Sequence, residues 1–464
     1  MRGILAWGGY LPHRRLDRRA IPALTGTGGG AGRRTVASYD EDATTLGVAA
    51  AAYALQDAPA EPRALWFATT DPPYADKTNA TALHAALRLD RAVPAYDAVG
   101  SVRSAVGALR AAFDAAVPVL VVAADLRGGL PGGPDEAAGG DGAAALLIGA
   151  DTDGPLLAEI VGSSSLTEEF LDRWRAPGEG ASRLWEERFG EARYTELGTE
   201  ALKLALEAAG IGPEDVGSLV VAGLHGRAAR AVAARSGVPA DRIADPLAAT
   251  VGNVGAAQPA LLLSRELEET PDPGRIIVLV VLSDGADVLV LRTTQALAGH
   301  RPTRPLAGQL DTGAAVGYGT YLAWRGLLPV EPPRRPEPAR PSSSAAHRNR
   351  DWKFGFVGSR ADDGMLRLPP SPLDGTAVPM SGTTGTIVTF TVDRLAYSPS
   401  PPVVFAVIDF DGGGRLPMEL TDVDVDEVRI GGRVEPTFRR LFTADGVHNY
   451  FWKARPVRAP EREA

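Results

Sequence analysis

Residues 97–122 read DAVGSVRSAVGALRAAFDAAVPVLVV and hold the strongest structural signal in the chain. A short apolar approach ends in a glycine, and the residues up to about 115 then place apolar side chains at helical spacing. Because small residues fill most other positions, we expect this helix to be buried inside a larger protein. Residues 117–122 have the length and β-branching of a buried strand. Several enzyme folds place a nucleophile where such a helix begins, and here Ser101 or Val102 stands there.

The bulk composition excludes several classes of protein. A chain of 464 residues is too long for one ordinary domain, so we expect two or three. The net charge of -9 argues against a nucleic-acid partner. The chain has no cysteine, which excludes disulfides, cysteine metal sites and cysteine catalysis. No apolar run approaches the roughly 18 residues of a membrane span, and none at the start has the length of a signal peptide. We therefore expect no membrane contact and a cytoplasmic location.

Strands and helices alternate along the first part of the chain, which is typical of a layered α/β domain. A helix is predicted over residues 42–57, with Asp42 as its cap. Residues 197–209 (LGTEALKLALEAA) echo residues 46–58 (LGVAAAAYALQDA), and a short loop and a strand follow each. These two similar halves predict a duplicated, layered α-β-α core whose ligand site lies where their strand ends meet. Residues 16–41 are rich in Gly and Arg, show no period and are predicted to form a loop or a lid.

The composition changes in the last third of the chain. Residues 329–350 are rich in Pro, Arg and Ser, which is typical of a linker. Short strands with turn residues between them are then predicted at 385–395, 403–409, 415–420 and 425–430. The DGGG run at 411–414 marks a hairpin. This spacing predicts a small all-β barrel after the linker.

Several ordered stretches carry a family resemblance. They are MRGILAWGGYLP from Met1, DPPYADKTNATALHAAL from Asp71, RWRAPGEGASRLWEERFGEARY from Arg173, GNVGAA from Gly252 and YLAWRGLL from Tyr321. Together they resemble the thiolase superfamily, nearest to its archaeal-type hydroxymethylglutaryl-CoA synthases, over about seven-tenths of the chain.

The part after the linker resembles the DUF35 OB-fold family, which accompanies thiolase-like enzymes. The expected division is a thiolase-like domain over 1–328, the linker over 329–350 and a DUF35-like OB-fold domain over 351–464. The DUF35 zinc ribbon needs paired CxxC motifs, and the matching segments 358–364 and 369–377 contain no cysteine. We therefore expect no bound metal, which elemental analysis for zinc would test.

The resemblance also exposes two departures at the catalytic positions. It implies a nucleophilic cysteine at the start of the buried helix, where this chain has Val102, or Ser101 with a slip of one residue. It implies a glutamate base just before the turn at PYA, where this chain has Thr70 with Asp71 beside it. The cysteine thioester of hydroxymethylglutaryl-CoA synthases is therefore not available here.

Two further positions match the family pattern. His225 follows an apolar strand, and Asn253 lies in a tight turn between two glycines. The resemblance implies that they form a His/Asn pair that binds a thioester carbonyl, which would stabilise an enolate or an oxyanion. Ser101 as a nucleophile activated by His225 and Asp71 in acid–base work are additional candidates. Without the resemblance, His225 is a structural histidine, Asn253 and Asp71 are turn residues, and Ser101 is a helix cap.

Two functions stay open at this point. The first is an acyl-CoA-binding enzyme of aldol- or Claisen-like C–C bond formation or cleavage, with a CoA thioester as substrate and no tightly bound cofactor. A Ser-dependent acyltransferase is a variant of it. The second is a non-catalytic scaffold subunit that binds a partner thiolase through its OB domain, which Thr70 and the missing cysteines favour. In both cases we expect a homodimer, with residues 119–122 as an edge strand that the partner covers.

Overall fold

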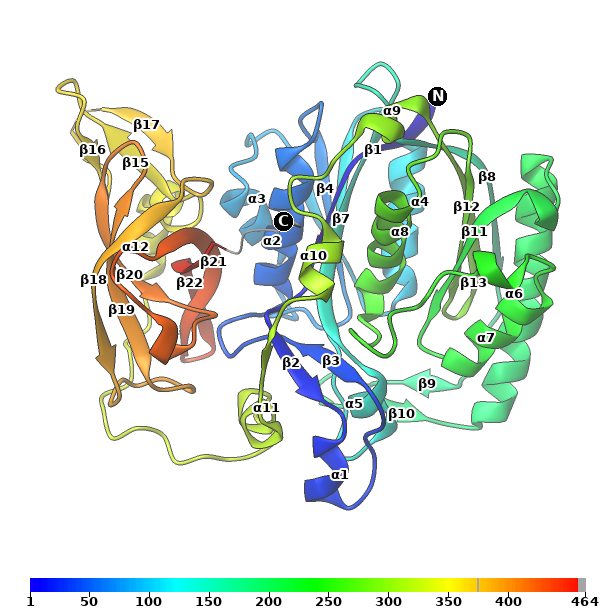
Figure 1. Cartoon of the computed structure of the whole chain (residues 1–464), viewed down its shortest axis with the longest axis horizontal. Helices are drawn as coiled ribbons and strands as arrows, with labels where there is room; N and C mark the ends of the chain where they lie inside the picture. Colours follow the sequence, from blue (N-terminus) through cyan, green and yellow to red (C-terminus); the bar gives the residue numbers. More distant parts are fainter. Residues whose placement is uncertain (374, 458–464) are drawn as a thin grey trace.

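The computed structural model describes residues 1–373 and 375–457. A layered α/β body lies beside a β-barrel (Figure 1). Asp374, within the expected ribbon, and residues 458–464 of the expected OB-fold domain lie outside the described residues. No helix in the described part is long and apolar enough to cross a bilayer.

One nine-stranded sheet organises the α/β body, in the order β11-β12-β13-β8-β1-β7-β6-β4-β5. Strands β4, β5 and β6 are parallel to one another in one half, and β11 and β12 are parallel in the other. The strands are β1 (Arg2–Tyr10), β4 (Ala64–Thr69), β5 (Ala95–Val99), β6 (Val119–Leu126), β7 (Asp141–Ala150), β8 (Ala158–Thr167), β11 (Val216–Gly223), β12 (Ile276–Leu282) and β13 (Gly285–Thr293).

Three helix layers enclose the two halves of this sheet (Figure 1). Helices α4 (Arg103–Asp114) and α8 (Gln258–Glu269) lie between the halves. The outer faces are covered by α2 (Ala43–Gln56) and α3 (Ala80–Ala86) on one side, and by α6 (Glu187–Ala209) and α7 (Gly226–Arg235) on the other. The sequence echo falls on α2 and α6, which pack against equivalent parts of the sheet. This arrangement confirms the duplicated, layered core.

Two local signals in the sequence set the helix starts. Asp42 caps α2 as predicted: its carboxylate accepts from the Thr45 backbone N–H at 3.0 Å, and the Asp42 N–H donates to the Thr45 hydroxyl at 2.9 Å. Gly100, between β5 and α4, has a φ of 114°, a backbone conformation that favours glycine. The buried helix therefore follows a sharp turn, as its sequence indicated.

Two expectations about the α/β body are wrong. Residues 119–122 belong to β6, which lies inside the sheet between β4 and β7, and the edge strands are β5 and β11. The apolar run reflects burial on both faces of the sheet rather than an exposed edge. Residues 16–41 are also more ordered than a loop. They contain α1 (Ala20–Thr25), β3 (Arg33–Val36) and the end of β2 (Arg14–Asp17), and β2 pairs with β3 on one side and with β14 (Ala314–Ala315) on the other.

The second part of the chain forms the predicted barrel. Five strands close it: β18 (Gly385–Asp393), β19 (Val403–Phe410), β20 (Arg415–Leu420), β21 (Arg433–Ala444) and β22 (Val447–Pro456). The DGGG run forms the β19–β20 hairpin as expected. The strand predicted at 425–430 is wrong, because Asp424 caps a short 3₁₀ helix, Val425–Glu427, there. The hairpin of β21 and β22 was missed because charged residues interrupt its apolar pattern.

Shorter elements complete the structure. A small sheet of β16 (Leu366–Arg367), β15 (Val357–Arg360) and β17 (Thr376–Pro379) precedes the barrel. The others are α5 (Pro134–Ala138), β9 (Arg173–Trp174), β10 (Arg183–Leu184), α9 (Gln295–Gly299), α10 (Leu306–Leu310), α11 (Tyr318–Trp324), α12 (Ser343–Arg348), α13 (Arg350–Lys353) and three 3₁₀ turns, Pro213–Asp215, Ala240–Arg242 and Gly255–Ala257.

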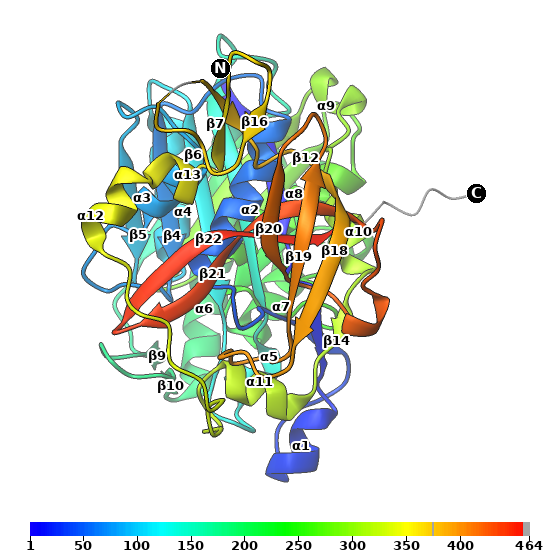
Figure 2. The same ribbon diagram turned by 90° about the vertical axis from the view of Figure 1, so that its left-hand side faces the viewer.

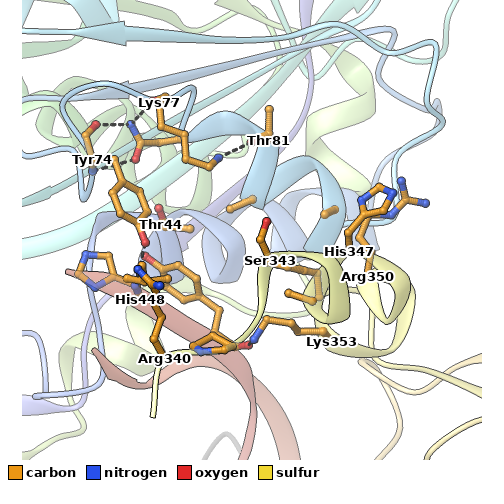
Figure 3. A pocket seen from close by; sticks show the side chains of 18 of the residues that line it. Thr44, Tyr74, Lys77, Thr81, Arg340, Ser343, His347, Arg350, Lys353 and His448 are labelled. Atoms are coloured by element: carbon orange, nitrogen blue, oxygen red, sulfur yellow. Dashed lines mark hydrogen bonds between the residues drawn. The ribbon is translucent and has the colours of Figure 1, made fainter. Parts of the chain in front are cut away.

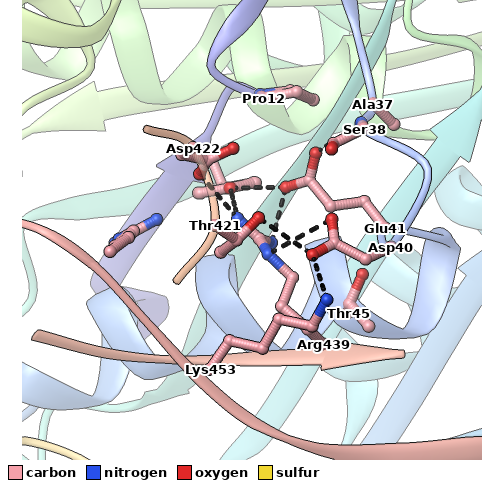
Figure 4. A network of polar contacts seen from close by, with 12 residues as sticks. Pro12, Ala37, Ser38, Asp40, Glu41, Thr45, Thr421, Asp422, Arg439 and Lys453 are labelled. Atoms are coloured by element: carbon pink, nitrogen blue, oxygen red, sulfur yellow. Dashed lines mark hydrogen bonds and ion pairs between the residues drawn. The ribbon is translucent and has the colours of Figure 1, made fainter. Parts of the chain in front are cut away.

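A buried ionic network fixes the barrel to the α/β body (Figure 4). Figure 2 shows β21 and β22 crossing in front of the body, where β21 contacts α2. Arg439 on β21 pairs with Glu41 at 2.6 Å and with Asp422 at 2.8 Å. Lys453 on β22 pairs with Asp40 at 3.0 Å. All five side chains are buried, and each of the two cations pairs with a carboxylate of the α/β body across the contact.

Candidate active site

A buried carboxylate, Asp125 at the end of β6, connects the strand ends of the two halves. Its Oδ1 accepts from the Thr69 hydroxyl at 2.9 Å and from the Thr70 backbone N–H at 2.6 Å. Its Oδ2 accepts from the Thr70 hydroxyl at 2.9 Å and from the Ala256 backbone N–H at 2.7 Å. With four donors and no exposed surface, Asp125 is a structural anchor. Sequence reasoning missed it; the only available signal was an aspartate that ends an apolar run.

Asn253 lies beside this anchor, in a turn that reaches β11. Its side-chain N–H donates to the Gly223 carbonyl at 2.8 Å, and its Oδ1 accepts from the Gly255 N–H at 2.9 Å. A Cβ on Gly255 would lie 2.1 Å from Asp125 Oδ2, and its φ is 58°. Glycine is therefore required at this position, because the turn passes directly over the carboxylate. The strand ends of the two halves do meet here.

His225 lies at the same end of β11, two residues after Gly223. It is the N-cap of α7, and its Nδ1 accepts from the Ala228 backbone N–H at 3.2 Å. Nε2 therefore carries the ring hydrogen and donates it to the Glu187 carbonyl at 3.0 Å. The half-buried ring thus links the N-termini of α6 and α7. Both ring nitrogens have local partners, and Nε2 is the one with a hydrogen to donate.

Asp71 lies on the turn that follows β4, with an exposed side chain. Its backbone N–H donates to the Thr69 hydroxyl at 3.0 Å, which places it next to the Asp125 anchor. Loss of solvation among the surrounding atoms raises the pKa of the Asp71 carboxyl, and the charge of Asp125 raises it further. Arg175 and other nearby arginines oppose this shift. Asp71 is thus a carboxyl with a raised pKa beside the Asp125 anchor.

Thr70 stands at the position where the resemblance implies a glutamate. Its hydroxyl donates to Asp125 and accepts from Arg127 at 3.1 Å, and its carbonyl accepts from Arg175. The hydroxyl is therefore held in a fixed orientation and cannot serve as a carboxylate would. Tyr74, on the same turn, points away toward the barrel, where its oxygen accepts from the His448 backbone N–H at 2.8 Å.

Ser101 and Val102 precede α4 at the end of β5. Val102 is the N-cap residue and is buried, so the interpretation of Ser101 as a helix cap is wrong. Ser101 is half-buried, and its hydroxyl has no hydrogen-bond partner among the described residues. The His225 ring is bonded to Glu187 and Ala228 rather than to Ser101. No Ser–His pair is formed in this arrangement.

Arg103, the first residue of α4, was not recognised from the sequence. Its guanidinium reaches the second half of the body, where it pairs with Asp287 at 2.9 Å. It also donates to the Asp284 carbonyl at 2.5 Å and to the Thr167 hydroxyl at 2.8 Å. Arg103 thereby fixes the start of the buried helix against β8 and β13. Its partners lie far away in the sequence, so no local pattern indicated them.

The barrel and the α/β body match different known proteins. The family model described as the C-terminal OB-fold domain of ChsH2 matches residues 377–439. The hydroxymethylglutaryl-CoA synthase of Thermococcus sibiricus is 30% identical over 337 residues, which cover 70% of this chain and 96% of that protein.

Solved structures show the same fold. MvaS in complex with 3-hydroxy-3-methylglutaryl coenzyme A gives a TM-score of 0.60 at 21% identity, covering 74% of this chain and 94% of MvaS. A hydroxymethylglutaryl-CoA synthase complexed with CoA gives a TM-score of 0.59 at 17% identity, covering 69% of this chain and 89% of that one. The α/β body therefore has a thiolase-like fold.

Proposed function

Because the chain belongs to the hydroxymethylglutaryl-CoA synthase family, we propose that it binds a CoA thioester and makes or breaks a C–C bond beside the thioester carbonyl. The observation that supports this proposal is the placement of His225 and Asn253 at one end of β11, where Asn253 lies in the turn that covers Asp125 and donates to the Gly223 carbonyl. Asp71 lies on the other side of the same anchor.

The chemistry rests on two hydrogen-bond donors. Asn253 uses one N–H for Gly223, and its amide has a second to donate. His225 Nε2–H exchanges the Glu187 carbonyl for the thioester oxygen. Two donors at that oxygen stabilise the enolate that forms when the neighbouring carbon loses a proton or a carbon substituent. Asp71 takes up or returns the proton.

The absence of cysteine excludes a reaction through a cysteine-bound acyl intermediate. No cysteine thioester is formed, and the acyl group stays on CoA throughout. A serine acyltransferase is less well supported, because the Ser101 hydroxyl has no base bonded to it among the described residues. One observation favours a second candidate, the non-catalytic subunit that binds a partner thiolase: Thr70 replaces the expected acid, and Asp125 and Arg127 hold its hydroxyl.

Deuterium exchange into the α-carbon of acetyl-CoA in D₂O tests the proposal without knowledge of the second substrate. His225→Asn keeps an acceptor that can cap α7 but shortens the reach of the donor. Asn253→Asp keeps the acceptor for the Gly255 N–H but removes the amide donors. We expect each variant to slow exchange by about 10²–10³-fold, because one donor is lost from the developing oxyanion.

Ser101→Ala is the matched control and should leave the exchange rate unchanged. Thermal unfolding of all three variants would separate lost chemistry from lost structure. If the wild-type protein catalyses no exchange, the scaffold function is the better account. If Ser101→Ala alone abolishes activity and His225→Asn has none of the expected effect, a serine acyltransferase replaces the proposal.

We also propose that the protein is a homodimer that pairs along β5. This strand is a sheet edge, and its Tyr96 and Val99 side chains are 49% and 47% exposed. An apolar edge strand is an aggregation site unless it is covered. Sedimentation should show a dimer at micromolar concentration that Tyr96→Lys dissociates, whereas Leu204→Lys, at an exposed leucine of α6, should not. A monomeric wild-type protein would contradict this proposal.

A further inference from the structure

A cavity of about 1070 Å³ lies between the α/β body and the barrel (Figure 3). One wall is the turn before α3 together with that helix, and the opposite wall is formed by the chain from Arg340 to Phe354. The tip of the β21–β22 hairpin contributes Val447, His448 and Tyr450. This volume is that of a site for a small organic ligand. The cavity is separate from the His225 and Asn253 site, although Tyr74 joins it to the turn that carries Asp71.

The ionisable side chains that line the cavity, apart from two tyrosines, are all basic. Its lining contains no aspartate or glutamate, but it contains Lys77, Arg340, His347, Arg350, Lys353 and His448. The Lys77 ammonium donates to the Thr81 hydroxyl at 2.8 Å and to the Thr78 carbonyl at 3.0 Å. Arg350 is paired with Asp351, so its charge is balanced. Among the described residues, Lys77 and Arg340 have no carboxylate within ion-pair distance.

Lys353 also has no carboxylate within ion-pair distance among the described residues. Its ammonium donates to the Tyr450 carbonyl at 2.7 Å and to the Asn449 side-chain oxygen, and both acceptors are neutral. Desolvation by burial lowers the pKa of Lys353 to about 8. A desolvated cation is costly unless an opposite charge accompanies it. The described residues supply no such charge at this position.

We propose that this cavity binds a phosphorylated anion of nucleotide size, whose phosphate groups are held by Lys77, Arg340 and Lys353. Phosphates carry the charge that the lining lacks and accept several hydrogen bonds from lysine and arginine. The Tyr74 and His448 rings, 4.9 Å apart between centroids and tilted by 40°, form an aromatic end to the cavity. The occupant is either the nucleotide end of a CoA thioester or a separate nucleotide. The proposal does not depend on the catalytic function.

Isothermal titration of the full chain tests this site with four probes: pyrophosphate, ADP, adenosine 3′,5′-bisphosphate and CoA. Lys77→Met, Arg340→Met and Lys353→Met should each weaken binding by about 10-fold or more, because each removes a charge-assisted contact. Arg334→Met is the matched control on the same segment. Arg334 is 91% exposed outside the cavity and should leave the affinity unchanged.

The outcomes distinguish the nucleotide end of a CoA thioester from a separate nucleotide. They also distinguish this binding proposal from the catalytic proposal. Competition between CoA and adenosine 3′,5′-bisphosphate identifies the nucleotide end of a thioester, whereas ADP binding without competition from CoA identifies a separate nucleotide. His225→Asn should retain this binding, so a failure of the catalytic proposal is seen separately. If no probe binds, or if Lys77→Met and Arg340→Met bind as the wild type does, the proposal is wrong. These two variants change exposed side chains and keep the test valid even if Lys353→Met does not fold.

Discussion

The family resemblance implies a glutamate base at the position of Thr70, and Asp71 is the carboxyl beside that position. The Thr70 hydroxyl is held between Asp125 and Arg127, so it cannot accept a substrate proton. Asp125 is fully buried, and its two oxygens already accept four hydrogen bonds. Asp71 is the neighbouring carboxyl with an exposed side chain. If the site moves protons, this residue is the one placed to do so.

The pH dependence of acetyl-CoA exchange tests this assignment. Asp71 accepts a proton only when it is ionised, so exchange should be lost as the pH falls through its pKa. Because desolvation and Asp125 raise that pKa, the acidic limb should lie above the usual range of an aspartate. Asp71→Asn should remove both the exchange and its acidic limb. Full exchange by Asp71→Asn with an unchanged profile would assign the base elsewhere.

The sequence predicted some individual residues and not others, for physical reasons. His225 and Asn253 were singled out because they match the family pattern; an apolar strand before a histidine and glycines around an asparagine would by themselves indicate only structural residues. The role of Asp125 was not predictable, since its partners Thr70 and Ala256 lie 55 and 131 residues away. Arg103 was missed for the same reason.

Among the helices and strands, too, those set by local sequence were predicted, and those that depend on contacts with distant residues were not. Helix α2 was predicted from its cap and its apolar spacing, because both are local properties. The hairpin of β21 and β22 was not, because Arg439 and Lys453 interrupt the alternation expected of a strand. These two residues are charged because they pair with Asp40 and Glu41 across the contact with the α/β body, and Arg439 pairs in addition with Asp422 of the barrel part.

Arg439→Met tests the contribution of this network to stability. Removal of Arg439 leaves buried carboxylates without their partner, so we expect a loss of about 3–5 kcal/mol in the free energy of unfolding. Arg433→Met is the matched control on the same strand: its pair with Asp411 is exposed, and its loss should have little effect. Denaturant unfolding measures both. Equal effects of the two variants would contradict the role of the network.

The sequence echo predicted the duplicated core of the chain because the two halves repeat a local pattern. The docking of the barrel was not predicted, because charges on two distant segments determine it. We propose that the chain divides into a thiolase-like domain over 1–328, a linker over 329–350 and an OB-fold domain over 351–464. In this division the linker connects the α/β body and the barrel, which the buried ion pairs of Arg439 and Lys453 also hold together.

Limited proteolysis tests that division. Cleavage should occur first within residues 329–342, which are mostly exposed and contain no helix or strand. The two fragments should nevertheless elute together in gel filtration, because Arg439 and Lys453 hold the barrel against the body. First cuts inside the nine-stranded sheet, or fragments that separate at once, would contradict this account.

The proposed function requires that His225 and Asn253 hold the carbonyl oxygen of a CoA thioester. A crystal structure of the protein soaked with acetoacetyl-CoA tests this claim. We predict the thioester oxygen within hydrogen-bond distance of His225 Nε2 and Asn253 Nδ2, with the Glu187 carbonyl released by the histidine and no covalent bond to Ser101. A thioester bound elsewhere while His225 still donates to Glu187, or an acyl group on the Ser101 oxygen, would contradict the claim.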